Sequence, residues 1–117
     1  MLTETPGSPY GASVGPEQMA ASADGSFVYV AAATWYAGGP CGTNYAELDT
    51  YKTAPGNGRL VKWQATLLPA WCPSAILATG SDVYVVLDNF GANKYGEIAG
   101  YESSSGSLKP ITGSPFP

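Results

Sequence analysis

The side chains best suited to chemistry in this chain gather in one stretch, Trp35 to Asn57. Aromatic faces flanked by a few hydrogen-bonding groups are what carbohydrate and small-molecule sites require. The stretch therefore predicts a ligand-binding loop, against the alternative that its aromatics pack the loop onto its own domain. The candidate ligand-binding residues are Trp35, Tyr36, Asn44, Tyr45, Glu47, Asp49 and Tyr51.

Catalytic and metal chemistry find few suitable groups in the sequence. The chain has no histidine, which is the commonest general base and metal ligand. Neither Cys41 nor Cys72 therefore has a histidine to activate it as a nucleophile. Glu47, Asp49 and Asp88 could contribute to a Ca²⁺ site, but no spacing matches a known Ca²⁺ loop, and solvated loop acids explain them equally well. We assign no catalytic residue, no metal site and no cofactor.

Composition and charge predict a folded, β-rich domain. Of 117 residues, 44% are hydrophobic, 12% aromatic and only 12% charged, with 15 glycines and 10 prolines, as expected for short strands joined by turns. The net charge is −4 and no basic run is present, which disfavours nucleic-acid binding. No run reaches the ~18–20 apolar residues of a membrane span, and the first ten residues do not resemble a signal peptide.

Hydrophobic alternation predicts a hairpin near the N-terminus. Residues 18–22 and 26–33 are expected to pair across the turn at 23–25, because the Asp-Gly pair in that turn tolerates positive φ. Val, Tyr and Phe in the second strand fit a pleated, buried surface. Residues 2–5 are expected to form a separate short strand.

The stretch from residue 35 to residue 57 has turn signals at both ends and no sustained period. It is expected to be a long loop with one helical turn near residues 45–50. Residues 58–64 are then expected to be a third strand, followed by a weak fourth strand at 65–69.

A second unit repeats this plan. The Tyr84 strand matches the Tyr29 strand, and residues 96–102 match 58–64, with Tyr101 in the place of Trp63. Asp88 begins a short polar loop. The strands of this unit are expected at residues 73–79, 82–87, 96–102 and 108–112.

The two ends of the chain also match each other. Leu2 to Tyr10 reads LTETPGSPY, and Leu108 to Phe116 reads LKPITGSPF. Four strands in ~40–55 residues, repeated along the chain, are typical of β-propeller blades. A β-sandwich with fortuitous internal similarity is the alternative.

The motifs also resemble a known family. Pro16 to Val30 reads Pro-x-x-apolar-Ala, then Gly, then apolar-Tyr-Val, and is followed by Gly-x-apolar-x-x-aromatic and later by Gly-Ser-Pro-Phe. This pattern resembles the repeats of bacterial seven-bladed lactonase-type β-propellers, which include phosphogluconolactonase-like and surface-repeat proteins. Blades of this kind serve many functions, so the resemblance carries no catalytic residue across.

The resemblance implies an all-β fold, a β-propeller segment made of two four-stranded antiparallel blades. Residues 1–10 would supply an outer strand of a preceding blade, and the chain would be a fragment of a longer propeller or a protomer that assembles into one. The first blade would span residues 16–69 with the loop insertion at 35–57, and the second would span 73–117.

The same topology places the 35–57 insertion on the ligand face, together with both cysteines. A Cys41–Cys72 disulfide is then expected, closing a loop of about 30 residues for roughly 3 kcal/mol in the chain-entropy model. It would imply an extracellular or periplasmic location. Two unrelated thiols are the alternative.

The expected function is that of a secreted binding or interaction scaffold that presents the 35–57 loop to a carbohydrate or small-molecule ligand. The rival is part of a lactone hydrolase whose catalytic groups lie in blades outside this chain. Two blades alone leave a sheet face uncovered. The expected partners are therefore the remaining blades of the same propeller, or further copies of the chain through self-association.

Overall fold

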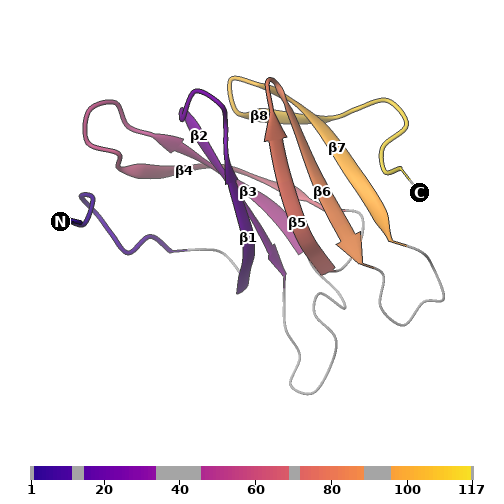
Figure 1. The fold of residues 1–117 in the computed structure, drawn as a ribbon, viewed down its shortest axis with the longest axis horizontal. Coiled ribbons are helices and arrows are strands. Elements are labelled where there is room, and N and C mark those ends of the chain that lie inside the picture. Colours follow the sequence, from indigo (N-terminus) through magenta and orange to yellow (C-terminus); the bar gives the residue numbers. More distant parts are fainter. Residues whose placement is uncertain (1, 12–14, 34–45, 69–71, 89–95, 117) are drawn as a thin grey trace, which may run out of the picture.

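The structure is a computed structural model, and it describes residues 2–11, 15–33, 46–68, 72–88 and 96–116. Within these ranges every regular element is a β-strand. The first four strands form sheet 1 and the last four form sheet 2, each an antiparallel meander in chain order (Figure 1). The strands are β1 (Gly15–Ala21), β2 (Phe27–Ala33), β3 (Ala46–Thr53), β4 (Leu60–Leu67), β5 (Cys72–Thr79), β6 (Asp82–Asp88), β7 (Glu97–Ser104) and β8 (Ser107–Pro110).

The predicted first hairpin is confirmed, and its turn is fixed by Asp24. The Asp24 carboxylate accepts hydrogen bonds from the Ser26 backbone N–H at 3.0 Å and from the Ser22 hydroxyl at 2.8 Å. These bonds lower the pKa of Asp24, the Ser26 backbone bond most strongly. Gly25 takes φ +75°, which a residue without a Cβ adopts at little cost. The turn therefore brings β1 and β2 into antiparallel register.

The third and fourth strands of sheet 1 correct the sequence prediction. β3 lies inside the stretch that was expected to be a loop with a helical turn. Residues 60–64 of the expected third strand belong instead to β4, which continues to Leu67 and pairs with β3. β2 pairs with β3 along its whole length, so the prediction that residues 58–64 form the third strand is wrong.

The carboxylates of β3 explain why the sequence pattern did not predict this strand. Glu and Asp are depleted in strands, and here Glu47 and Asp49 interrupt the apolar pattern on one face. Lys62 of β4 lies against both, at 4.0 Å and 3.4 Å, so that two buried acids are tolerated in a sheet. The segment is stable as a strand because Lys62, on the next strand along the chain, compensates its two acids.

The expected strand at residues 2–5 is also absent, since the described part of the N-terminal segment contains no strand. The repeated Gly-Ser-Pro motif nevertheless adopts the same turn at both ends. Gly7 and Gly113 both have φ +90°, and both Ser-Pro bonds are cis. The Ser8 N–H donates to the Thr5 carbonyl at 3.1 Å, and the Ser114 N–H donates to the Ile111 carbonyl at 2.9 Å. The sequence repeat is thus a repeat of a turn.

The two sheets are copies of one another in strand register. β1 and β5 each carry an irregularity just after a proline, Pro16 and Pro73. Val28 pairs with Tyr51, and Val83 pairs with Tyr101, which makes Tyr51 the counterpart of Tyr101. The predicted match between Trp63 and Tyr101 is therefore wrong, because Trp63 lies one strand farther out. The predicted match of Tyr29 with Tyr84 is consistent with the pairing.

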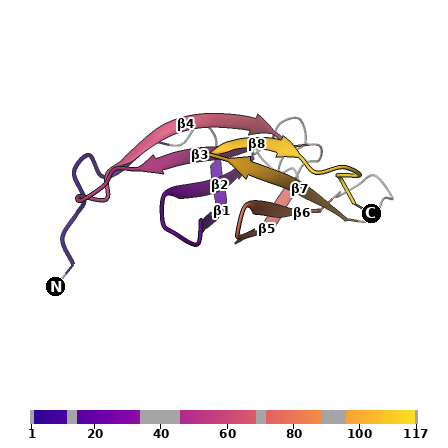
Figure 2. The same cartoon turned by 90° about the horizontal axis from the view of Figure 1, so that it is seen from above.

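The sheets stack face to face through one inter-sheet core. Alternate residues of a strand point to opposite faces, so Tyr29 points toward sheet 2 whereas Val28 and Val30 point away. From first to fourth strand both sheets run in the same direction (Figure 2). The core consists of Tyr29, Ala31 and Leu48 from sheet 1, with Val83, Val85, Leu87, Ala99 and Tyr101 from sheet 2.

One polar contact and one close packing contact position the two sheets against each other. The Tyr29 and Ser103 hydroxyls lie 3.1 Å apart across the interface. The Phe27 ring packs over Gly106 in the β7–β8 turn, where an added Cβ would lie 2.5 Å from the ring. Glycine is required there both for space and for a φ of +87°.

Candidate functional site

The structure relocates the predicted ligand-binding residues that it describes. Glu47, Asp49 and Tyr51 lie on β3 in the middle of sheet 1, not on a loop, and each is at most 4% exposed. The prediction that these three belong to a presented loop is therefore wrong. The other candidates, Trp35, Tyr36, Asn44 and Tyr45, lie outside the described residues, and so does any site that they form.

Glu47 and Asp49 make an acidic pair on the face of β3 that points away from sheet 2. Burial raises the pKa of Asp49, and the adjoining Glu47 carboxylate raises it further, while the Lys62 ammonium opposes both effects. Lys62 lies 3.4 Å from the Asp49 carboxylate and keeps its own side chain 38% exposed. The cluster sets two carboxyl groups against one ammonium, and the Lys62 contacts offset part of the cost of burying the acids of β3 in the sheet.

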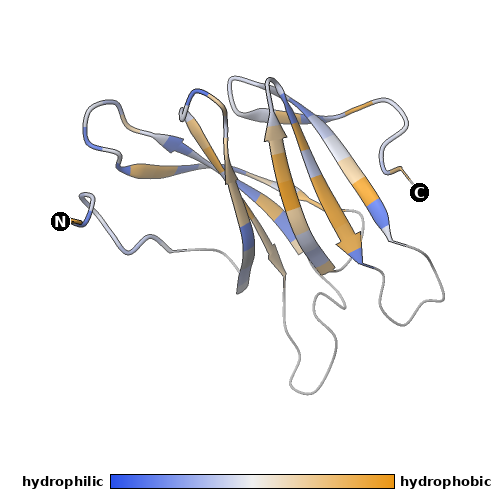
Figure 3. Cartoon of the chain, in the orientation of Figure 1, coloured by the Kyte–Doolittle hydropathy of each residue, from blue (hydrophilic) through white to orange (hydrophobic). Residues whose placement is uncertain are grey.

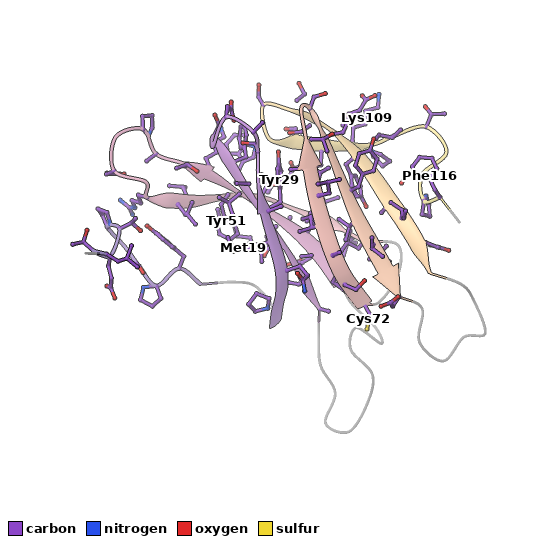
Figure 4. The ribbon with its side chains drawn as sticks, in the orientation of Figure 1. Met19, Tyr29, Tyr51, Cys72, Lys109 and Phe116 are labelled. Carbon is purple, nitrogen blue, oxygen red and sulfur yellow. The ribbon has the colours of Figure 1, made fainter. Side chains whose placement is uncertain are left out.

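An apolar groove lies on the same face of sheet 1. Two of its lining residues, Met19 and Tyr51, are labelled in Figure 4. Its volume is about 460 Å³. Tyr51 forms one wall and donates a hydrogen bond from its hydroxyl to the Gly11 carbonyl at 3.0 Å, and burial raises the pKa of this tyrosine. The groove is lined by Tyr10, Pro16, Gln18, Met19, Val28, Val30, Tyr51 and Leu60.

The apolar lining of this groove matches residues that the stacking buries in sheet 2. We call these five residues the open face of sheet 1: Met19, Val28, Val30, Tyr51 and Leu60. Their register counterparts, in the same order, are Ile76, Val83, Val85, Tyr101 and Leu108.

Those counterparts either belong to the inter-sheet core or pack against it. Val83 and Val85 are at most 1% exposed, whereas Val28 and Val30 are only half-buried and Met19 is 64% exposed. Apart from Tyr51, which is as buried as Tyr101, the open face is therefore the equivalent of a core surface that lacks the sheet to cover it.

Sequence reasoning missed this site. It singled out polar and aromatic residues in one stretch, whereas the open face comes from β1, β2, β3 and β4. The signal that was available is the register match itself: Met19 corresponds to Ile76, and Val30 to Val85. Only the pairing shows that one set is buried and the other is not.

The opposite end of the stack has an uncovered face too. We call this the far face of sheet 2: Leu77, Tyr84, Val86, Ile98 and Phe116. Leu77, Val86 and Ile98 are 58%, 37% and 42% exposed, and hydrophobic residues follow β5 and β6 (Figure 3). The C-terminal segment folds back so that Phe116 exchanges backbone hydrogen bonds with Ile98, at 2.7 and 2.8 Å.

Trp63 makes a contact with a lysine on the neighbouring strand. Lys52 places its ammonium 3.3 Å from the centre of the Trp63 ring, a cation–π contact between β3 and β4.

Cys72 is 2% exposed at the start of β5 (Figure 4) and is not a free thiol. Cys41 lies outside the described residues, so the predicted Cys41–Cys72 pairing stays a prediction.

The described ranges hold neither a cluster of metal-ligating side chains nor a membrane-crossing helix. No group of three or more histidine, cysteine or acidic side chains is gathered there as a metal site would need. No helix in those ranges is suited to crossing a membrane.

The chain matches no protein-family model, no curated protein and no solved structure. The resemblance to lactonase-type propellers therefore stays a hypothesis that rests on the sequence motifs.

Proposed function

We propose that this chain is a repeat segment of a β-propeller-type scaffold, whose function is to bind a partner through the exposed faces of its stacked sheets. One observation carries the proposal. Five apolar residues of the open face have the register of residues of sheet 2 that the stacking buries, whereas Asp49 stands where the inter-sheet core has Ala99. Repeat proteins are stabilised largely by such neighbour interfaces, so an uncovered copy of one is a binding surface.

The groove on the open face gives this surface a shape. Its volume of about 460 Å³ falls in the range of small-molecule pockets, but its walls are spread across all four strands. The charged groups beside it on the same strands, Asp49 and Lys62, are already paired with each other. A further β-sheet with apolar side chains fits this surface better than a polar small molecule does, because the groove lining is mostly hydrocarbon.

A matched pair of substitutions tests the proposal. Val30→Lys places a charge on the open face, and Val85→Lys places the same charge at the register counterpart inside the core. We expect Val85→Lys to lose the folded state, because an unpaired buried ammonium is strongly unfavourable. Val30→Lys should keep the wild-type circular dichroism and unfolding midpoint.

The readout of binding is an apolar fluorescent dye, anilinonaphthalene sulfonate. Wild-type protein should bind the dye on both exposed faces, and Val30→Lys should lose the dye that is bound at the open face while the far face of sheet 2 keeps its share. Equal unfolding by both variants, or dye binding unchanged by Val30→Lys, would refute an open binding face. Hydrolysis of γ- or δ-lactones by the wild-type chain would instead favour the rival hypothesis of a lactone hydrolase.

A further inference from the structure

A shielded hydroxyl on the open side of sheet 1 lacks the partner that its counterpart has. Thr53 corresponds to Ser103, since Thr53 pairs with Leu60 and Ser103 pairs with Leu108. Ser103 meets the Tyr29 hydroxyl across the inter-sheet interface at 3.1 Å. The Thr53 hydroxyl, shielded from solvent, has no hydrogen-bond partner among the described residues.

The tyrosine that would serve Thr53 exists on the far face of sheet 2. Tyr84 is the counterpart of Tyr29, because their neighbours Val83 and Val28 pair with Tyr101 and Tyr51. Within the described ranges the Tyr84 hydroxyl makes no hydrogen bond. A sheet 2 stacked on sheet 1 in the way that sheet 1 stacks on sheet 2 would bring Tyr84 to Thr53.

The same operation brings opposite charges together at one corner. In the observed interface Phe27 packs on Gly106. The counterpart of Phe27 is Asp82. Counted back from the matched Leu60 and Leu108, Gly106 corresponds to Gly58, which precedes the exposed Arg59 in a connection that is two residues longer between the matched pairs than the β7–β8 turn. A stacked sheet 2 would thus place the Asp82 carboxylate beside the Arg59 guanidinium.

The acidic residue opposite Asp82 makes a positively charged neighbour such as Arg59 favourable. Asp82 lies directly across from Glu102 on β7, and like charges in opposite positions of a sheet are unfavourable. Lys109 of β8 lies on the other side of Glu102. Among the described residues no ion pair engages Asp82 or Arg59, so both remain available to a partner.

The apolar surfaces agree with these polar contacts. The open face presents Met19, Val28 and Val30, and the far face presents Leu77, Val86 and Ile98, all at least partly exposed. The open face of sheet 1 corresponds to the side of sheet 2 that is buried against sheet 1. The far face of sheet 2 corresponds to the side of sheet 1 that is buried against sheet 2. Joining the two would extend the inter-sheet core, with the Asp49–Lys62 pair beside the position that Ala99 fills in the observed core.

We propose that the open face of sheet 1 binds the far face of sheet 2 from a second copy of this chain. Tyr84 of the incoming copy then bonds Thr53, and its Asp82 pairs with Arg59. The contact is head-to-tail, since the two surfaces differ. This inference rests on the proposed function and names the partner of the same face.

Charge reversal tests the pairing directly. Arg59→Asp and Asp82→Arg should each weaken self-association at least about tenfold, because like charges in an interface are strongly unfavourable. The double variant should return to within about threefold of wild type, since the pair is restored with opposite sense. Sedimentation velocity over a concentration series measures association, and circular dichroism establishes that each variant is folded.

Two tyrosine variants give a matched control that is independent of charge. Tyr84→Phe removes the hydroxyl that serves a second copy, and should weaken association while leaving the unfolding midpoint unchanged. Tyr29→Phe removes the hydroxyl that serves Ser103 within one chain, and should lower the midpoint while leaving association unchanged. Wild-type association by Tyr84→Phe, or no recovery in the charge-reversed double variant, would overturn the second copy as partner.

The two proposals fail in different ways. Loss of dye binding in Val30→Lys together with no recovery in the double variant leaves the open face as a binding surface and removes the second copy. Absence of dye binding in the wild-type protein removes the open face itself, and the head-to-tail contact with it.

Discussion

At the scale of single residues, Gly106 shows how closely the two sheets approach. Its φ is +87° and a Cβ would lie 2.5 Å from the Phe27 ring. Gly56 has the same φ of +87°, but a Cβ there meets no atom within 4 Å. The two glycines therefore separate backbone strain from steric conflict.

We predict that Gly56→Ala lowers the free energy of unfolding by about 1–2 kcal/mol, the cost of a left-handed conformation for an L-residue. Gly106→Ala should lower it by a further 1–3 kcal/mol or so, because the Phe27 ring must move. Urea unfolding gives both values. Equal losses in the two variants would mean that the ring gives way without strain.

Asp49 gives a prediction on pH. Its pKa is raised in the folded state by burial and by Glu47, so the folded protein holds this proton more tightly than the unfolded chain does. Stability from this group is therefore greatest at low pH. This stability falls as the pH rises from about 3.8, the ordinary pKa of an aspartate, through the higher folded pKa.

We expect Asp49→Asn to remove this fall. The difference in free energy of unfolding between Asp49→Asn and wild type should grow in favour of the variant as the pH rises from 3.5 to 7. Asp24 acts in the opposite sense in both proteins, because its pKa is lowered, and cancels in the difference. A difference that is flat with pH would contradict a raised pKa for Asp49.

At the scale of strands, the sequence predicted much of the fold and little of the site. The Asp24-Gly25 hairpin and all four strands of sheet 2 could be predicted, because alternation and turn residues are local signals. β3 could not, since its buried acids are compensated by Lys62 on a neighbouring strand. The open face could not either, because whether Val30 is covered depends on stacking and not on its own strand.

The connection between β2 and β3 bears the remaining sequence prediction, the Cys41–Cys72 disulfide. If it forms, mass spectrometry after oxidising purification should find the two cysteines joined and no free thiol. Reduction should then speed amide hydrogen exchange within residues 34–45, while β3 keeps its protection because it is bonded to both β2 and β4. Two free thiols in the oxidised protein would remove both the bond and the inference of an oxidising compartment.

At the scale of the molecule, each sheet has one side buried against the other sheet and one side uncovered. Sheet 1 covers one side of sheet 2, and the corresponding side of sheet 1 is open. A contact between two different surfaces does not end at a dimer, because each added copy leaves one of each surface free. Head-to-tail association therefore predicts species larger than a dimer as concentration rises.

Blocking one surface in each of two variants turns this series into a defined complex. Val30→Lys disables the open face and keeps the far face, whereas Val86→Lys disables the far face and keeps the open one. Each variant alone should sediment as a monomer, because its association would have to bury an unpaired ammonium.

An equimolar mixture should form a one-to-one complex and nothing larger, because only the far face of the first and the open face of the second can join. A symmetric contact between like faces gives a different result. Only the variant that keeps the self-pairing face would then associate on its own, and mixing would create no one-to-one complex.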